Sequence, residues 1–188
     1  MFKLLRALSA GLALAAAAQV QAVTIDFEGF GPGTLITNQY AGLGVNFSGA
    51  SISNYTCCGT PTATLVTATD GGGSGRTGIL NIIFSGGASG VSFGYNNYGS
   101  LLGGYFQAFD SSNTLIETQG YTVASFSALE LISFASSGIA SITITSPSVP
   151  SWLVAIDDLT FNVPEPGSLA LLGLALLGLG GTRRRARS

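Results

Sequence analysis

From Val23 to Phe161 the chain is dominated by short stretches in which apolar and polar residues alternate, separated by clusters of Gly, Ser, Asn and Asp. The first of these stretches is Val23-Thr24-Ile25-Asp26-Phe27. A period of two places successive side chains on opposite faces of the backbone, as in a strand with one buried face. A parallel α/β fold would require amphipathic helices between the strands, and the sequence has no such pattern there. The alternation therefore predicts an all-β domain.

Nine or ten short strands are expected from this pattern. Packing two antiparallel sheets against each other would bury the apolar faces, so we predict an antiparallel β-sandwich that is jelly-roll-like. The strongest helix candidate, Ser125–Leu131, is too short to change this class. One hairpin is expected, with Asp110–Asn113 as its turn and Thr114–Glu117 as its returning arm. The expected strands are Val23–Phe27, Gly44–Phe47, Ala63–Thr67, Ile79–Phe84, Val91–Tyr95, Tyr105–Phe109, Thr114–Thr118, Leu129–Phe134, Ile139–Thr145 and Leu153–Phe161.

Residues 1–22 have the three parts of a secretory signal peptide. A basic start containing Lys3 and Arg6 precedes an apolar run from residue 7 to residue 18, and Val20-Gln21-Ala22 places small residues at a signal peptidase site. The apolar run is well short of the ~20 residues that a membrane-spanning helix needs. We therefore predict cleavage by signal peptidase and a mature chain that begins near Val23.

The charge of residues 23–163 limits the class of partner. This segment has one basic side chain, Arg76, against eight acidic ones, which gives a formal charge of −7, and it contains no Lys or His. Nucleic acid is excluded as a partner, because phosphate binding needs clustered Lys and Arg. Cations and neutral sugars suit such a surface better.

Residues 164–188 differ sharply from the domain before them. Pro164-Glu165-Pro166 ends the strand pattern, an apolar Leu/Gly/Ala segment follows, and Arg183, Arg184 and Arg185 begin a basic end. As a helix of about 14 residues the apolar segment would span about 21 Å, which is short for a hydrocarbon core of about 30 Å. Local thinning and snorkelling arginines allow such a short transmembrane helix. The arginines would keep the C-terminus cytoplasmic, so that the domain faces outward.

This tail resembles the PEP-CTERM sorting signal of Gram-negative bacteria, from the Pro-Glu-Pro triplet through the short helix to the arginine cluster. The resemblance implies that an exosortase, a membrane protease or transpeptidase, processes the chain near Pro164, Glu165 and Pro166. It further implies a protein that is transiently anchored in the inner membrane facing the periplasm. A final place at the cell surface or in an exopolysaccharide-rich biofilm matrix would follow.

The domain carries a second resemblance, at its two ends only. Ile25–Gly29, Gly33–Leu35, Gln39-Tyr40 and Gly44–Phe47 resemble the opening of a common class of PEP-CTERM ectodomains, and Ala155–Phe161 resembles their closing strand. That class is similar to galactose-binding-like jelly rolls, many of which are carbohydrate-binding modules. The domain is therefore expected to be either a structural surface or matrix protein or a carbohydrate-binding module with glycan affinity.

The same resemblance implies a structural calcium ion held by Glu28 and by an acid of the last strand, Asp157 or Asp158. Calcium takes 6–8 oxygen ligands, so backbone carbonyls of residues 30–34 and Asn38 would have to complete its shell. The period-two rule points Asp157 and Asp158 to opposite faces, so that at most one is directed inward. The alternative is that these acids are solvated charges at strand ends.

Cys57 and Cys58 are the only cysteines, and they are adjacent. An oxidising periplasmic destination favours a disulfide over free thiols. Neighbouring Cα atoms lie 3.8 Å apart, closer than the usual separation of ~4.4–6.8 Å in a bridge, so a vicinal disulfide would be strained. A vicinal bridge is favoured, with intermolecular bridges and reduced thiols as the alternatives.

Ligand binding is expected first at Tyr95-Asn96-Asn97-Tyr98, because it pairs aromatic rings with amides just outside an expected strand. The alternative is that these aromatics fill the core. Catalysis is not expected, since no His is present for a Ser-His-Asp or Cys-His arrangement. A carboxylate pair such as Glu117 with Glu130 would be the remaining route, through glycoside hydrolysis.

Overall fold

A computed structural model describes residues 20–53, 64–67, 79–97, 105–120, 129–145 and 154–164. Residues 22–163 form a unit of their own. The described part contains no helix that is long and apolar enough to cross a membrane. Its elements are β1 (Val20–Ile25), β2 (Leu35–Ile36), a 3₁₀ turn (Ala41–Leu43), β3 (Val45–Ser48), β4 (Ala50–Ser53), β5 (Thr64–Thr67), β6 (Ile79–Asn97), β7 (Tyr105–Phe109), β8 (Leu115–Gly120), β9 (Glu130–Ser133), β10 (Ser137–Thr145) and β11 (Val154–Pro164).

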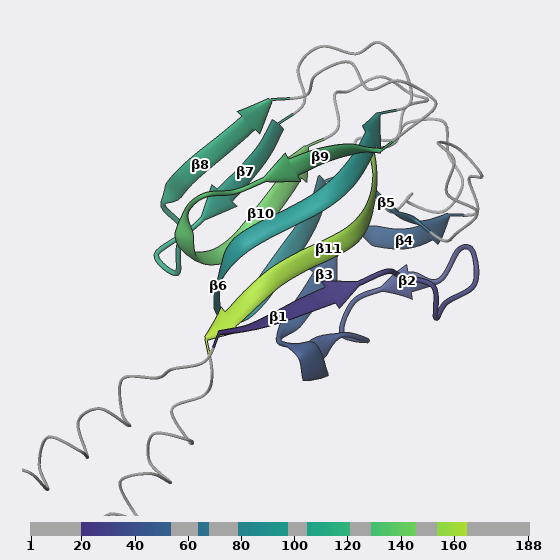
Figure 1. Ribbon diagram of the computed structural model, residues 1–188. Helices are drawn as coiled ribbons and strands as arrows, with labels where there is room; N and C mark the ends of the chain where they lie inside the picture. Colours follow the sequence, from purple (N-terminus) through teal and green to yellow (C-terminus); the bar gives the residue numbers. More distant parts are fainter. Residues whose placement is uncertain are drawn as a thin grey trace, which may run out of the picture. The chain divides into compact units, whose positions relative to one another are not determined.

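The strands form two layers that share β6 (Figure 1). In the first layer the order is β3-β6-β10-β7-β8, and it uses the first half of β6. In the second layer the order is β2-β4-β5-β11-β6-β9, it uses the second half of β6, and β1 also pairs with β11. The predicted antiparallel β-sandwich is therefore confirmed.

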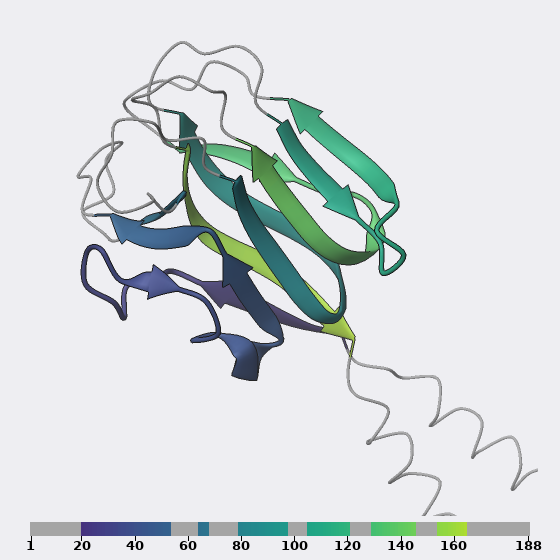
Figure 2. The same cartoon turned by 180° about the vertical axis from the view of Figure 1, so that it is seen from behind.

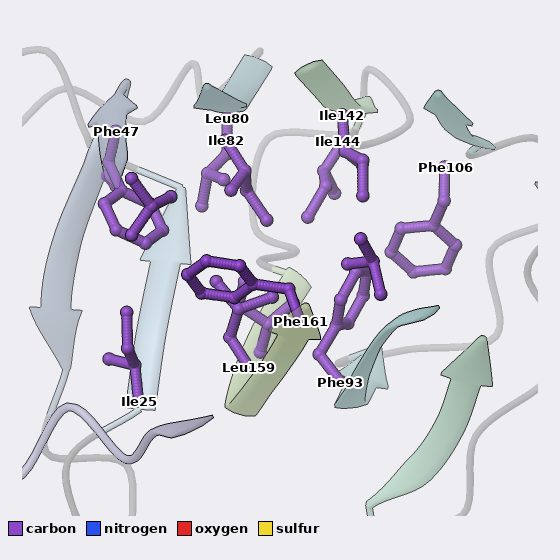
Figure 3. Close-up of a cluster of buried hydrophobic side chains, with 14 of the residues drawn as sticks. Ile25, Phe47, Leu80, Ile82, Phe93, Phe106, Ile142, Ile144, Leu159 and Phe161 are labelled. Carbon is purple, nitrogen blue, oxygen red and sulfur yellow. The ribbon is translucent and has the colours of Figure 1, made fainter. Parts of the chain in front are cut away.

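The core lies between the two layers. Figure 3 shows Leu80, Ile82 and Ile142 of the first layer directed toward Leu159 and Phe161 of the second, and all five side chains are buried. Each layer contributes alternate residues of its strands, as the period-two pattern predicts. Removing these apolar surfaces from water is the main force that holds the layers together.

Glycines convert two predicted strands into one. Ile79–Phe84 and Val91–Tyr95 were expected to be separate because Gly86, Gly87 and Gly90 lie between them, but β6 runs through all three. Gly87 and Gly90 have φ of +78° and +57°, which glycine adopts without strain. The buried hydrophobic residues also change from even positions, such as Leu80 and Ile82, to odd positions, such as Val91 and Phe93, across this bend. A single strand can thereby pass from one layer to the other.

The predicted hairpin is confirmed, and its turn has a clear physical basis. The Asp110 carboxylate Oδ1 accepts hydrogen bonds from the backbone N–H groups of Ser112 and Thr114, at 2.8 and 2.9 Å. Asn113 adopts φ of +59°, a left-handed conformation that Asn tolerates better than most residues. The turn sets the pairing of β7 with β8, from Phe109 opposite Leu115 onward.

Two strands were missed, and one helix candidate is partly wrong. β2 has only two residues, too few for a period of two to be recognised, and β4 begins just one residue after β3, so the sequence contains no separate signal for it. Of the helix candidate Ser125–Leu131, Glu130 and Leu131 lie in β9, because they pair with Tyr95 and Gly94 of β6. Its residues 125–128 lie outside the described residues.

Candidate functional site at the junction of the first and last strands

The first and last strands of the domain lie side by side (Figure 1). Thr24 of β1 and Thr160 of β11 share a hydrogen bond between their hydroxyl oxygens at 3.0 Å. The two ends of the domain are therefore neighbours in space. This junction is where the chain enters and leaves the sandwich.

The junction also contains the start of the C-terminal tail. β11 extends to Pro164, and Val163 packs against the hydrophobic core. Pro164 is therefore the last residue of the strand, and the predicted tail begins with it. The rest of the predicted sorting segment, including Glu165, Pro166, Arg183, Arg184 and Arg185, lies outside the described residues.

A β-bulge in β11 changes which of its side chains face the core. Asp158 has φ of +51°, and the pairing of β11 with β6 shifts between Asp157 and Thr160. Before the bulge even-numbered residues such as Ile156 are in the core, and after it odd-numbered residues such as Phe161 are. Such a bulge inserts one extra residue into a strand and increases its twist.

Asp157 and Asp158 differ completely in exposure. The Asp157 side chain is only 3% exposed, whereas Asp158 is exposed. Asp157 lies on the face of β11 opposite to the core residue Ile156, so this face is covered as well. Of the two acids only Asp157 is buried, and the bulge at Asp158 interrupts the period-two alternation from which their opposite directions were predicted.

Burial raises the pKa of the Asp157 carboxyl to about 6 from an ordinary 3.8. The negative charges of Asp158, Glu28 and Asp26 act in the same direction, while the hydrogen bond from the Asp158 backbone N–H to Asp157 Oδ1, at 2.9 Å, acts against them. The described residues include no basic side chain to offset this charge. We call these four acids, Asp26, Glu28, Asp157 and Asp158, the acidic junction.

The acidic junction does not by itself form a metal centre. Among the described residues no group of three or more His, Cys, Asp or Glu side chains converges closely enough to hold a metal ion. Asp158 is exposed whereas Asp157 is buried, and the Asp26 carboxylate Oδ1 accepts a hydrogen bond from the Glu28 backbone N–H at 3.3 Å. Calcium binding by Glu28 with Asp157 or Asp158 therefore stays a prediction from the sequence.

The expected ligand loop is wrong for the residues that the structure describes. Tyr95, Asn96 and Asn97 lie in β6, and the Tyr95 and Asn96 side chains are buried. The Tyr95 ring packs edge-to-face on Phe106 at 5.0 Å, and its hydroxyl donates to Glu130 Oε2 at 2.9 Å. Tyr95 is thus a core residue whose polar end is satisfied, and it cannot stack on a sugar. Tyr98 lies outside the described residues.

Glu117 has a structural task in the sandwich. Its carboxylate accepts hydrogen bonds from the backbone N–H groups of Ala135 and Ser136, at 3.2 and 2.9 Å, and from the Gln119 amide at 3.0 Å. Partial burial acts to raise the Glu117 pKa, but these hydrogen bonds outweigh it and lower the pKa. The side chain ties edge strand β8 to the connection between β9 and β10.

Cys57 and Cys58 lie outside the described residues, so the predicted vicinal disulfide stays a prediction.

Comparison with known proteins identifies the tail. Residues 162–185 match the PEP-CTERM protein-sorting motif, which confirms the predicted signal. The motif marks an exported protein with a C-terminal membrane-anchor region. No curated protein matches the chain.

Among solved structures, similar folds occur in family 29 carbohydrate-binding modules. A mutant complexed with mannohexaose is 13% identical and has a TM-score of 0.45, over 78% of this chain and 94% of that chain. A mutant complexed with cellulohexaose is also 13% identical, with a TM-score of 0.44 over 78% and 93%.

Proposed function

We propose that this chain is the cargo of an exosortase, which removes the C-terminal tag and leaves the β-sandwich as a non-enzymatic protein of the cell surface or the biofilm matrix. The observation that carries the proposal is the PEP-CTERM motif at residues 162–185, which begins inside β11. The folded domain and the sorting signal are therefore directly continuous.

The fold is compatible with processing at both ends. Within β1, signal peptidase cleavage after Ala22 would remove Val20 and the exposed Gln21 and Ala22 but keep the buried Ile25. Cleavage beyond Pro164 would leave all of β11 in place, including Val163 on the core. Among the described residues, neither cut removes a member of the hydrophobic core, so we expect the processed domain to stay folded.

The absence of His and Lys from residues 23–163 supports the non-enzymatic part of the proposal. Nucleophilic catalysis commonly relies on such a base. Glycoside hydrolysis would need a pair of carboxylic acids, and both acids of the pair considered from the sequence already accept hydrogen bonds within the domain. Glu117 accepts backbone hydrogen bonds, and Glu130 accepts one from Tyr95. Turnover of a chromogenic glycoside that is lost in Glu117→Gln would overturn this part.

Mass spectrometry of the protein recovered from the surface of its native host tests the sorting proposal. We expect a mature chain that begins near Val23 and ends close to Pro164, without Leu171 or Arg185. Replacing Glu165 and Pro166 with Ala should leave the tail attached and the protein in the membrane fraction. Arg187→Lys is the matched control, because it lies outside the matched motif and keeps the charge. Recovery of the exported protein with its arginines still attached would overturn the proposal.

A second candidate function is specific glycan binding by the domain. The formal charge of −7 over residues 23–163 favours neutral glycans over anionic ones, which this charge would repel. Retention of the processed protein on a neutral polysaccharide, and not on an anionic one, is the expected result.

A further inference from the structure

The outer face of the first layer carries an in-register row of uncharged polar side chains. Ser48, Asn81, Thr143, Gln107 and Thr118 lie directly opposite one another on β3, β6, β10, β7 and β8. Their neighbours on β6, β10 and β7, such as Ile82 and Ile142, are buried, so the row faces away from the core on these strands, and Ser48 and Thr118 continue it opposite Asn81 and Gln107. All five are exposed or half-buried.

Exposed apolar side chains flank the polar row. Ile83 lies on one side of it, opposite Ser141, and Ile79 and Tyr105 lie on the other, both opposite Thr145. Ile79, Ile83 and Tyr105 are 53%, 43% and 49% exposed. Figure 2 shows the five strands of this layer side by side. We call the polar row with these three flanking residues the neutral face.

The neutral face contains no charged side chain among its described residues. The two acids nearest in sequence are directed elsewhere, since Asp110 closes the β7–β8 turn and Glu117 lies opposite the buried Ala108 on the inner side. A ligand that covers this face would not have to desolvate a charge, which is expensive without a partner. The face thus favours a ligand without charge of its own.

The chemistry of the face matches that of a neutral polysaccharide. Hydroxyl and amide side chains both donate and accept hydrogen bonds, as sugar hydroxyls do. Successive strands lie about 4.8 Å apart, which spaces the five polar side chains on the scale of the sugar rings in an extended chain. Tyr105 and the two isoleucines offer apolar contact for the faces of the rings. The row is held on strands, and the Thr143 hydroxyl donates to Asn81 Oδ1 at 2.9 Å.

We propose that the neutral face binds an extended, uncharged polysaccharide chain that runs along the row from β3 to β8. This inference rests on the second candidate function and gives it a location. Binding would rest on hydrogen bonds and apolar contacts without ion pairs, so it should change little with ionic strength. Anionic polysaccharides should bind weakly or not at all.

Affinity electrophoresis of the processed protein through gels that contain mannan, β-glucan or alginate tests the proposal. We expect retardation by a neutral polysaccharide and none by alginate. Tyr105→Ala and Gln107→Ala should each weaken binding by about tenfold, the effect expected for losing one or two good contacts. Gln107→Glu keeps the shape and adds a charge, and it should weaken binding at least as much. Leu131→Ala is the matched control, because Leu131 is an exposed apolar residue of β9 in the other layer.

The remaining outcomes separate the proposal from the functions on which it rests. Binding that the Tyr105 and Gln107 variants leave unchanged would overturn the neutral face and keep glycan binding elsewhere on the domain. No retardation by any neutral polysaccharide would overturn both, while delivery to the surface is decided separately by mass spectrometry. Sedimentation of the wild type as a dimer that Gln107→Glu dissociates would overturn the proposal in favour of a second copy as the occupant. Thermal melts should show each variant as folded as the wild type, since the altered side chains lie outside the core.

Discussion

Asp157→Asn should make the domain more stable at neutral pH. The buried Asp157 carboxyl has its pKa raised to about 6 from 3.8, so its ionised form is less favourable in the folded chain than in the unfolded one. This difference corresponds to about 3 kcal/mol as an upper limit, at about 1.36 kcal/mol for a tenfold change. Solvent access beside the exposed Asp158 reduces the expected gain to about 1–2 kcal/mol. Asn keeps an Oδ1 that can accept the hydrogen bond from the Asp158 backbone N–H.

The pH dependence gives this prediction its sign. The folded chain holds the proton more tightly, so between pH of about 4 and 6 it binds more protons than the unfolded chain, and the wild type loses stability as the pH rises. The advantage of Asp157→Asn should therefore be full above pH of about 6 and vanish near pH 4. Urea unfolding of both proteins at several pH values measures it, with Asp158→Asn as a control that removes a charge but keeps the buried carboxyl. If Asp157→Asn is less stable than the wild type at pH 7, the ionised carboxylate is stabilising and the reasoning fails.

Three further predictions concern the glycines, the edge strand and calcium. Gly49→Ala should destabilise the domain by at least about 2 kcal/mol in thermal melts, because its Cβ would lie 2.1 Å from the Ile79 carbonyl oxygen. Gly138→Ala is the control: its φ of +72° is close to the +70° of Gly49, but no atom lies within 4 Å of the added Cβ, so it should destabilise the domain by only about 1 kcal/mol. Equal losses of stability for the two variants would contradict the reasoning. Glu117→Ala should lower the free energy of unfolding by about 1–2 kcal/mol, because the Ser136 N–H loses its acceptor. The difference from the wild type should fade as the pH falls below 4.5, because folding lowers the pKa of the Glu117 carboxyl and its stabilising effect is lost when it is protonated. If calcium binds the acidic junction, chelation should lower the melting temperature of the wild type but not of Asp157→Asn, and a melting temperature that chelator leaves unchanged would remove the calcium prediction.

Most strands could be predicted because alternation is a local property of the sequence. Tyr105–Phe109 was predicted with the bounds that β7 has, since aromatic residues favour strands and a turn-forming Asp follows it. β6 could not be predicted as one strand, because Gly87 and Gly90 are equally typical of a turn and of a bend within a strand. Only the pairing of β6 with both layers selects the bend.

The acidic junction shows a second limit of local patterns. The sequence indicates that at most one of Asp157 and Asp158 is directed inward, and only Asp157 is buried. It does not indicate that the outward-facing side of β11 is also covered, which makes Asp157 a buried carboxyl instead of a solvated one. Burial of Tyr95 was missed for the same reason: its contact with Phe106 joins residues of different strands. Such contacts depend on tertiary packing, which no single stretch of sequence contains.

The neutral face requires still more than burial, because it depends on register. Ser48, Asn81, Gln107, Thr118 and Thr143 each look like an ordinary outward-facing residue of a half-buried strand. They form one row only because four strand pairs bring them opposite one another. A shift of any one pair by a single residue would turn that strand's polar side chain toward the core and break the row. The same registers place Ile82, Ile142 and Ala108 in a buried row on the inner side, so the packing of the core also maintains the row on the outer face.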